Sequence, residues 1–378
     1  MRIGVLGGGP GGLYFSALWK SRHPGDDVHL FEQNPKDATW GFGVVFSDRA
    51  LEFLREDDAE TVDLIAPRME TWHDITIVHR GTSVAIDGVG FSAIGRLELL
   101  QLLQQRARDA GVVLHFGTAV ASLDNLGAYD LIVAADGVNS LVRRTFAREL
   151  GSSLTHLDSK FVWYGTTRRF ETLTQTFVAN DLGKFNAHHY RYAPSMSTFI
   201  VECDPATWQR AGLDRATEDE SRHICEHVFA ATLDGHPLVA NRSVWRNFPW
   251  VWNERWSTGN TVLIGDALHT AHYSIGSGTR LALEDALALT KALEAEPGDL
   301  TAGLIRFEAT RRPVVEKLVA ASKLSAAWYE RFPEHMRLAP VDLAMSYIRR
   351  SGRVDNDRLR TMAPRFMARY DADGGRDE

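Results

Sequence analysis

The stretch GDALHTAHYSIGSGT combines residue types that could do chemistry. Asp266, His269 and His272 follow one another at three-residue intervals. On a helix this spacing would place a carboxylate and two imidazoles on one face, as in a metal site. Gly276 and Gly278 indicate a different chemistry, because glycine lets the backbone come very close to a bound anionic group. The secondary structure expected around the stretch distinguishes between a metal site and a ligand-binding loop.

A glycine-rich turn follows the first apolar run of the chain. Gly7, Gly9 and Gly12 have the GxGxxG spacing, between an expected strand and an expected helix over 13–22. The first glycine permits the turn, the second lets backbone approach a pyrophosphate, and the third lets helix and strand pack closely. Glu32 ends the next expected strand, where an acidic side chain can accept hydrogen bonds from a ribose. The pattern predicts an ADP-binding fold and leaves FAD and NAD open.

Composition narrows the class of protein. A length of 378 residues suggests about two domains, and 44% hydrophobic with 24% charged residues is typical of a globular protein. The net charge of -7 argues against a general nucleic-acid binder. Cys203 and Cys225 lack zinc-site spacing and are expected to be free thiols. Without a long apolar run or a signal-like start, we expect a cytoplasmic protein with no membrane segment.

Two further motifs place an aspartate at the end of an apolar strand. In YDLIVAADGVNSLVRR the expected strand over 131–135 is followed by Asp136, and in NTVLIGD the expected strand over 261–264 is followed by Gly265 and Asp266. Open α/β folds bind ligands at the carboxyl ends of their strands. Because an apolar strand precedes the stretch around His269 and glycines follow it, a loop is favoured there over a helix. The metal-dependent hydrolase that would use Asp266, His269 and His272 is therefore the weaker alternative, and we expect no metal.

The three motifs together resemble the group A flavoprotein monooxygenases with the p-hydroxybenzoate hydroxylase fold, in order and spacing over essentially the whole chain. The resemblance implies an α/β fold with a Rossmann-like FAD-binding domain, an inserted mainly β substrate-binding domain and C-terminal helices. No second GxGxxG is found, which agrees with FAD as the resident nucleotide. The expected division is 1–70, 95–155 and 256–330 for the FAD-binding domain, 71–94 and 156–255 for the substrate-binding domain, and 331–378 for the C-terminal helical segment.

The resemblance also implies the roles of individual residues. Asp136 and Arg143 would serve FAD and a visiting nicotinamide, Asp266 would bond the ribityl chain, and Arg96 would open a helix beside the flavin. The helix after Gly278 would point its positive end at reduced flavin. The complete predicted cofactor site is Gly7, Gly9, Pro10, Gly11, Gly12, Glu32, Gln33, Gly43, Val44, Arg96, Asp136, Arg143, Asp266, Gly276, Ser277, Gly278 and Thr279.

Within this family, the segments WYGTT, STFIVEC, WRNF and HTAHYSIGSGTRLALEDA are similar to those of salicylyl-CoA 5-hydroxylases and of the N-terminal half of 2-aminobenzoyl-CoA monooxygenase/reductase. This similarity implies an FAD enzyme with NADH or NADPH as reductant and O2 as co-substrate. Such an enzyme forms a C4a-hydroperoxyflavin and hydroxylates an aromatic acyl-CoA, here salicylyl-CoA to gentisyl-CoA. Hydroxylation of 2-aminobenzoyl-CoA, or of an indole or tryptophan-derived intermediate as in violacein biosynthesis, stays open. A flavin-dependent halogenase on the same fold is a further alternative.

His272 and Tyr273 are the predicted catalytic residues. A histidine near pKa 7 could act as base toward a phenol, with Tyr273 lining the substrate ring. Tyr273 stands where the family motif has proline, so it marks a subgroup. His188 and His189 are further candidates for the base.

The predicted partners are limited to small molecules. We expect an aromatic substrate, as a CoA thioester, and a monomer or homodimer without nucleic acid or membrane. Surface cations of the middle region could hold the CoA phosphates, although a solvated face explains them as well; they are Lys160, Arg168, Arg169 and Arg191.

Overall fold

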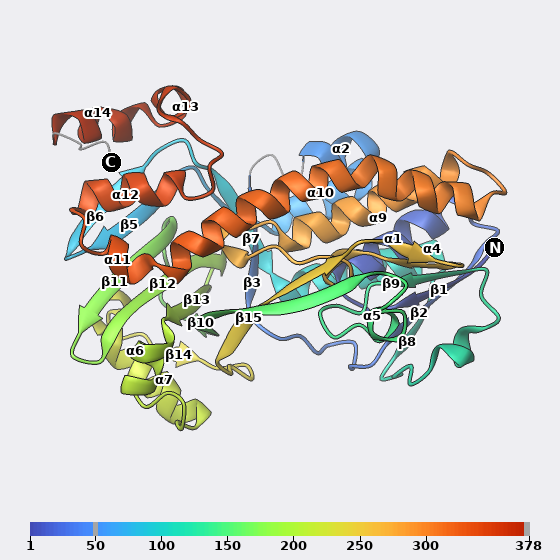
Figure 1. Cartoon of the computed structure of the whole chain (residues 1–378), viewed down its shortest axis with the longest axis horizontal. Coiled ribbons are helices and arrows are strands. Elements are labelled where there is room, and N and C mark those ends of the chain that lie inside the picture. Colours follow the sequence, from blue (N-terminus) through green and yellow to red (C-terminus); the bar gives the residue numbers. More distant parts are fainter. Residues whose placement is uncertain (48–51, 374–378) are drawn as a thin grey trace.

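A parallel sheet with helices packed on it forms one end of the molecule (Figure 1). The structure is a computed structural model that describes residues 1–47 and 52–373. Residues 48–51 and 374–378 of the predicted domains lie outside the described residues. The strands are apolar runs buried in the sheet, as parallel sheets require. Their order is β16 (Ser257–Thr258), β17 (Thr261–Leu263), β9 (Leu131–Ala134), β1 (Arg2–Leu6), β2 (Asp27–Glu32) and β8 (Val113–Phe116), all parallel except β16.

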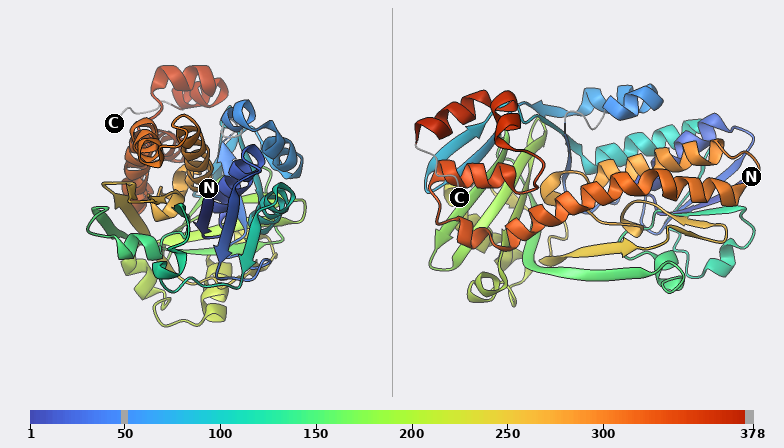
Figure 2. Two further views of the ribbon diagram at one scale, coloured as in Figure 1. Left: turned by 90° about the vertical axis from the view of Figure 1, so that its right-hand side faces the viewer. Right: turned by 45° about the horizontal axis from the view of Figure 1, so that its top comes forward.

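A larger sheet of mainly antiparallel strands forms the other end (Figure 1). Only β5 and β11 pair in parallel, which brings an early segment of the chain beside the middle of it. The long strand β10 also pairs with β15, and both run back toward the parallel sheet (Figure 2). The strands are β14 (Leu238–Val239), β10 (Ser152–Thr166), β13 (Met196–Cys203), β12 (Gly183–Ala193), β11 (Leu173–Asn180), β5 (Ile75–His79), β6 (Thr82–Ile86) and β15 (Arg246–Asn253).

Helices cover both parts. Among them, α1, α4 and α9 pack on one another beside the parallel sheet, and α6, α7 and α8 lie against the larger one. A small third sheet, in the order β3, β7, β4, lies between the two large ones. The elements are α1 (Pro10–Arg22), α4 (Arg96–Ala110), α5 (Leu141–Thr145), α6 (Pro205–Arg210), α7 (Glu218–Val228), α8 (Ala230–Leu233), α9 (Gly278–Glu294), β3 (Gly43–Ser47), β7 (Phe91–Gly95), β4 (Glu70–Trp72), α2 (Glu52–Asp57) and α3 (Ala59–Ile65).

One helix, α10 (Leu300–Glu330), runs along most of the molecule and joins its two ends (Figure 1). Its first half buries Phe307 and Val315 in the core of the parallel sheet. Its second half buries Trp328 and Tyr329 in a core with β5, β6 and the C-terminal helices. Those helices are α11 (Phe332–His335), α12 (Pro340–Arg349), α13 (Asn356–Met362) and α14 (Pro364–Ala372).

The predicted fold class is confirmed. A Rossmann-like part, a mainly β part and C-terminal helices are all present. The segments DITIVHR, SVAID, KFVWYG and STFIVEC form β5, β6, the end of β10 and β13, as their β-branched residues predict. None of the helices in the described ranges combines the length and the apolar character that crossing a membrane requires.

Candidate functional site

A cavity of about 470 Å³ lies where the two large sheets meet. Short segments at the ends of β3, α4 and β17 form one wall, which we call the flavin wall. Strands β10, β12, β13 and β15 form the opposite wall, which we call the substrate wall. The predicted site residues that line this cavity are Gly43, Val44, Arg96, Asp266, Tyr273, Gly276, Ser277, Gly278 and Thr279.

The glycine loop between β1 and α1 has the geometry that its sequence predicts. A Cβ on Gly7 would lie 2.3 Å from the Ala135 oxygen, and one on Gly12 would lie 2.1 Å from the Gly7 oxygen. Gly7 has a positive φ of 98°, which glycine adopts most easily. By contrast, a Cβ on Gly9 would meet nothing within 4 Å. Gly7 and Gly12 are therefore required by packing, whereas the backbone at Gly9 faces open space.

Four further residues of the predicted cofactor site lie in this loop or beside it. Pro10 begins α1, whose first turn has no side-chain cap, so its N–H groups stay available to an anion. A Cβ on Gly11 would lie 3.2 Å from the Ala282 oxygen, so this glycine lets α1 and α9 pack closely. Glu32 accepts a hydrogen bond from the Gly8 N–H at 2.7 Å, which holds its carboxylate beside the loop. Gln33 is exposed next to it.

A cation and a carboxylate face each other on the flavin wall. Arg96 begins α4, and its backbone N–H donates to the Phe42 oxygen at 2.7 Å. The Nε atom of Arg96 is buried without a hydrogen-bond partner among the described residues. Burial lowers the pKa of Arg96, and the charge of Asp266 opposes this shift. Burial likewise raises the pKa of Asp266, which His269 and Arg96 partly offset.

The loop that follows Asp136 is hydrogen-bonded to the loop that contains Asp266. Arg143 is buried, and its Nη1 donates to the Ala267 oxygen at 3.1 Å. Its other terminal nitrogen donates to the Val138 oxygen. Asp136 accepts from the Leu141 N–H at 2.7 Å, while its Oδ1 is buried without a hydrogen-bond partner in the described part of the chain. Arg143 thus joins two loops through main-chain oxygens, and neither Arg143 nor Asp136 lines the cavity.

Helix α9 begins at Gly278, directly on the cavity. The loop before it turns at Gly276, which has a φ of 60°. A Cβ on Gly276 would lie 3.1 Å from Val45, whereas one on Gly278 would meet nothing within 4 Å. The positive end of this helix therefore faces the cavity with little side chain in between, which favours negative charge there.

These features fit FAD. The open space at Gly9 and at Gly278 is where backbone would lie against a bound group. The unpartnered Nε of Arg96 supplies a donor at the start of α4, on the cavity, and the unpartnered Oδ1 of Asp136 supplies an acceptor just after β9. A dinucleotide offers phosphate and hydroxyl partners for such groups. FAD bound here would be held by the glycine loop, Arg96, Asp266 and the start of α9.

The metal-site alternative fails on geometry. Asp266 lies in a short 3-10 turn over Gly265–Ala267, and His272 follows in a loop, so the three residues do not share a helix face. His269 Nε2 instead lies 2.9 Å from Asp285 Oδ2 on α9. Across residues 1–47 and 52–373, no group of three or more metal-type side chains is close enough to hold an ion.

His269 belongs to a buried charge network. Asp285 is fully buried and accepts hydrogen bonds from the Gly265 N–H at 3.0 Å and from Arg311 Nε at 2.9 Å. Burial acts to raise the pKa of Asp285, but the charges of His269 and Arg311 outweigh it and lower the pKa to about 2. The network therefore fixes the loop that begins at Gly265 to α9 and α10. This gives His269 a structural role, which the sequence pattern did not indicate.

His272 does not line this cavity, although Ala271 and Tyr273 on either side of it do. Its ring is 1% exposed, and its Nδ1 lies 2.8 Å from Ser274 Oγ. Burial lowers the pKa of His272 to about 3, so the ring is neutral at pH 7. The prediction of a base with a pKa near 7 therefore does not suit this residue. Its ring packs 4.1 Å, centroid to centroid, from that of Tyr273.

Tyr273 lines the first cavity. Its hydroxyl donates to Glu202 Oε2 at 2.8 Å. Glu202 is buried on β13, and burial raises its pKa to about 8, so it is mostly protonated at pH 7. His188, on β12 opposite Ile200 of β13, lines the same cavity, and burial lowers its pKa to about 4. His189 points to the opposite face of the sheet, where it lies 3.0 Å from Thr176 Oγ1.

Aromatic side chains complete the substrate wall. Phe161 and Trp163 on β10 and Phe248 on β15 line the cavity. The glycines of the β3 loop fit against this wall, because a Cβ on Gly41 would lie 2.6 Å from the Trp163 ring and one on Gly43 would lie 2.4 Å from Tyr192. The wall is therefore apolar and closely packed at its edge, which excludes water.

Sequence reasoning missed Glu202, and the four surface cations expected to hold CoA lie outside this cavity. An acid inside the apolar strand STFIVEC was a signal for a buried polar role. The four expected CoA cations are engaged elsewhere: Lys160 donates to Asn247 Oδ1, and Arg168, Arg169 and Arg191 pair with Asp234, Glu171 and Glu70. Their side chains point to these partners and not into the cavity, whose lining includes none of the four.

Fold and site together define a dinucleotide-binding enzyme with an aromatic pocket. The family described as FAD binding domain matches residues 128–322, and the chain belongs to this family. It is 39% identical over 361 residues to salicyloyl-CoA 5-hydroxylase of Streptomyces sp, covering 93% of this chain and 70% of that protein. It is 37% identical over 334 residues to 3-hydroxy-4-methyl-anthranilyl-[aryl-carrier protein] 5-monooxygenase of Streptosporangium sibiricum, covering 88% and 90%.

A solved structure with the same fold is 2-methyl-3-hydroxypyridine-5-carboxylic acid oxygenase. The TM-score is 0.74 at 18% identity, with 96% of each chain covered. This similarity shows the fold alone. With the family and the relatives, it makes the chain an FAD-dependent aromatic monooxygenase.

Proposed function

We propose that this hydroxylase acts on an aromatic acyl-CoA, with conversion of salicylyl-CoA to gentisyl-CoA as the reaction, NADH or NADPH as reductant and O2 as co-substrate. The observation that carries the proposal is the 39% identity to salicyloyl-CoA 5-hydroxylase over 93% of this chain. The aromatic side chains of the substrate wall, with neutral His188 among them, support it, because an electron-rich ring needs apolar surroundings and hydrogen-bond partners for its hydroxyl.

We also propose the cofactor site and the domain division set out from the sequence. The glycine loop, Glu32, Arg96, Asp266 and the start of α9 hold FAD, with Asp136 and Arg143 shaping the loops around it. The parallel sheet with its helices forms the FAD-binding domain, and the larger sheet forms the substrate-binding domain. When bound, FAD would take two electrons from the nicotinamide and activate O2, so that one oxygen atom is transferred to the ring and the other leaves as water.

The chain's own residues position the ring. Neutral His188 hydrogen-bonds the substrate hydroxyl, since none of its ring nitrogens has a partner among the described residues and the ring faces the cavity. Tyr273 packs against the substrate ring and is held in place by its bond to Glu202. His272 is a positioning residue, because its ring packs against the ring of Tyr273. Phe161 and Phe248 keep the site dry.

A second candidate substrate is a 2-aminobenzoyl thioester. The 37% identity to a monooxygenase that acts on an anthranilyl group favours it. An amino group can hydrogen-bond neutral His188 in place of a hydroxyl, so the site geometry accepts either ring.

The test compares substrates directly. NADH or NADPH oxidation is followed with salicylyl-CoA, 2-aminobenzoyl-CoA, free salicylate and tryptophan, and the products are identified by mass. We expect coupled hydroxylation of salicylyl-CoA and much slower turnover of free salicylate. Hydroxylation of free acids without hydroxylation of thioesters would refute the acyl-CoA assignment.

A further inference from the structure

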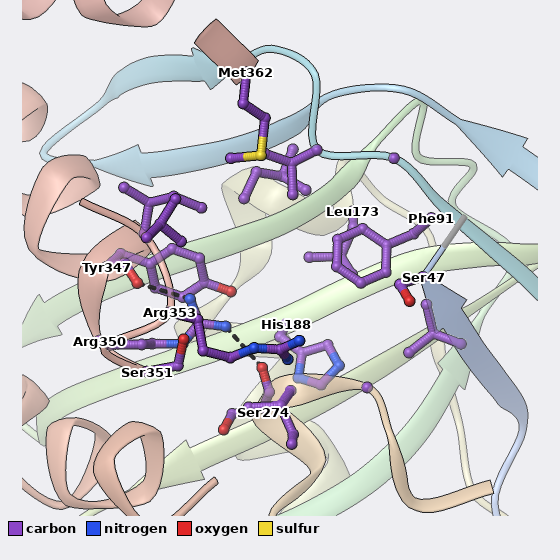
Figure 3. A pocket seen from close by; sticks show the side chains of 18 of the residues that line it. Ser47, Phe91, Leu173, His188, Ser274, Tyr347, Arg350, Ser351, Arg353 and Met362 are labelled. Atoms are coloured by element: carbon purple, nitrogen blue, oxygen red, sulfur yellow. Dashed lines mark hydrogen bonds between the residues drawn. The ribbon is translucent and has the colours of Figure 1, made fainter. Parts of the chain in front are cut away.

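A second cavity of about 530 Å³ adjoins the first one. The two share Val45, His188, Tyr273 and Gly276 in their linings, so the substrate wall opens at this point into a further space. In Figure 3, Arg350 and Arg353 of the C-terminal segment lie on one side of this space, and Phe91 and Leu173 lie on the other. A single aromatic ring does not need this additional volume.

Four arginines line the second cavity, and two of them have structural tasks. Arg350 donates to the Tyr347 and Ser274 oxygens at 2.7 Å each, and its guanidinium lies 3.8 Å from the centroid of the Tyr347 ring. Arg280 pairs with Glu284 Oε1 at 2.6 Å. These two arginines hold the wall of the cavity in place.

The other two arginines carry unbalanced charge. Arg353 and Arg358 are exposed at the rim, and neither makes an ion pair with any residue in the described ranges. The hydrogen bond of the Arg358 side chain goes to the Arg353 oxygen at 3.4 Å. Burial lowers the pKa of Arg353, and the charges that add to this shift are those of Arg280 and Arg358, both positive. The rim therefore attracts anions.

We propose that this second cavity binds the pantetheine arm of an acyl-CoA substrate and that Arg353 and Arg358 bind its phosphates. The assignment rests on the proposed acyl-CoA function and adds the place where the CoA part lies. The cavity begins at His188 and Tyr273, where the substrate ring ends, and reaches arginines at its rim. Planar guanidinium groups bind phosphate oxygens through paired hydrogen bonds. The apolar side chains Val89, Phe91 and Met362 line the space between.

The same chemistry is present in a phosphopantetheine arm attached to a carrier protein. That arm carries a single phosphodiester, whereas CoA carries a diphosphate and a further phosphate. Two guanidinium groups at the rim suit the larger anionic group of CoA. The experiment therefore includes both thioesters.

The test uses the FAD-loaded enzyme and a double variant, Arg353→Ala with Arg358→Ala. Substrates are salicylyl-CoA and salicylyl-pantetheine, which has the same arm without phosphates. We expect the KM for salicylyl-CoA to rise about tenfold or more, with the kcat and the KM for salicylyl-pantetheine unchanged. Arg210→Ala with Arg215→Ala is the matched control, because it removes two exposed arginines near α6 and should change neither KM.

Each outcome has one meaning. A KM for salicylyl-CoA that stays at the wild-type value, or equal rises for both substrates, overturns the phosphate site. Salicylyl bound to a phosphopantetheinylated carrier protein is the third substrate, and a loss confined to this substrate overturns the assignment to CoA. If the wild-type enzyme hydroxylates none of the thioesters, the proposed function itself fails, which is distinct from a failure of the site.

Discussion

The two walls of the first cavity are built in different ways. On the flavin wall, Arg96, Asp266 and Gly278 each stand within a residue or two of the end of a strand or the start of a helix. On the substrate wall, His188 and Phe248 come from strands β12 and β15, which are far apart in the sequence. Local backbone geometry therefore places the flavin wall, whereas the register of a large sheet places the substrate wall.

The walls also differ in charge. The flavin wall holds Arg96 and Asp266, and buried polar atoms around it lack a partner within the described ranges. The buried groups of the substrate wall are neutral at pH 7, because burial lowers the pKa of His188 to about 4 and raises that of Glu202, which accepts from Tyr273, to about 8. Arg246, a cation that also lines this wall, is exposed at the start of β15. The difference suits a charged cofactor on one side and a neutral aromatic ring on the other.

The largest expected effect concerns the network that anchors the flavin wall. Asp285→Ala would leave His269 and Arg311 buried without their shared carboxylate. We expect the free energy of unfolding, measured by urea denaturation at pH 7, to fall by about 3–5 kcal/mol. Asp63→Ala removes an exposed ion pair with Arg55 and should cost at most about 1 kcal/mol. Equal losses in the two variants would show that the network does not anchor this wall.

The next prediction distinguishes a loss of FAD affinity from a loss of packing in the glycine loop. Gly9 has a φ of -74° and open space around a Cβ, so Gly9→Val should change the stability of the FAD-free protein by at most about 1 kcal/mol. The valine would nevertheless occupy the space expected for FAD, and we expect FAD affinity to fall about tenfold or more. FAD titration by fluorescence measures this. Gly25→Val is the control, since that position is equally open but lies away from the groove.

The sequence predicted the flavin wall well because each of its parts is a short motif. A glycine turn, an aspartate after an apolar strand and a glycine before a helix can be read within about ten residues of sequence. The fold class followed from the same motifs. The site assignments themselves stay predictions.

The substrate wall could not be predicted in the same way. His188 and His189 are neighbours, yet only the sheet register decides which of them faces the cavity. Glu202 and His272 depend on burial, which sets their pKa values and is decided by contacts between distant segments. Arg353, just before α13, and Arg358, within α13, line a cavity with Val45 and Phe91, which are far from them in the sequence.

A smaller effect is expected on the substrate wall. His188→Ala removes one hydrogen bond to the substrate, so kcat/KM for salicylyl-CoA should fall about 10- to 100-fold, as initial rates will show. His189→Ala is the neighbouring control, because this ring lies on the opposite face against Phe170 and Phe199. The control should lower stability and keep kcat/KM. An equal fall of kcat/KM in both variants would contradict the assignment of His188.

The last prediction is a pH dependence of stability that comes from Glu202. The pKa of Glu202 is raised to about 8 in the folded protein from an ordinary value of 4.5, so the folded state holds a proton that the unfolded state releases. Its contribution to stability is complete below about pH 4.5 and is lost as the pH rises to about 8. The free energy of unfolding of Glu202→Gln, measured by urea denaturation from pH 5 to 8, should lack this decline. A parallel pH profile in the two proteins would show that Glu202 is not protonated in the fold.

The most direct test of the division into two walls is a crossed comparison of Gly9→Val and His188→Ala. FAD content and the ratio of hydroxylated product to NAD(P)H consumed are measured for both variants with salicylyl-CoA. We expect Gly9→Val to lose FAD while the enzyme that remains loaded keeps its coupling ratio. His188→Ala should keep its FAD and lose coupling. Loss of FAD in both variants, or full coupling in His188→Ala, would contradict the account.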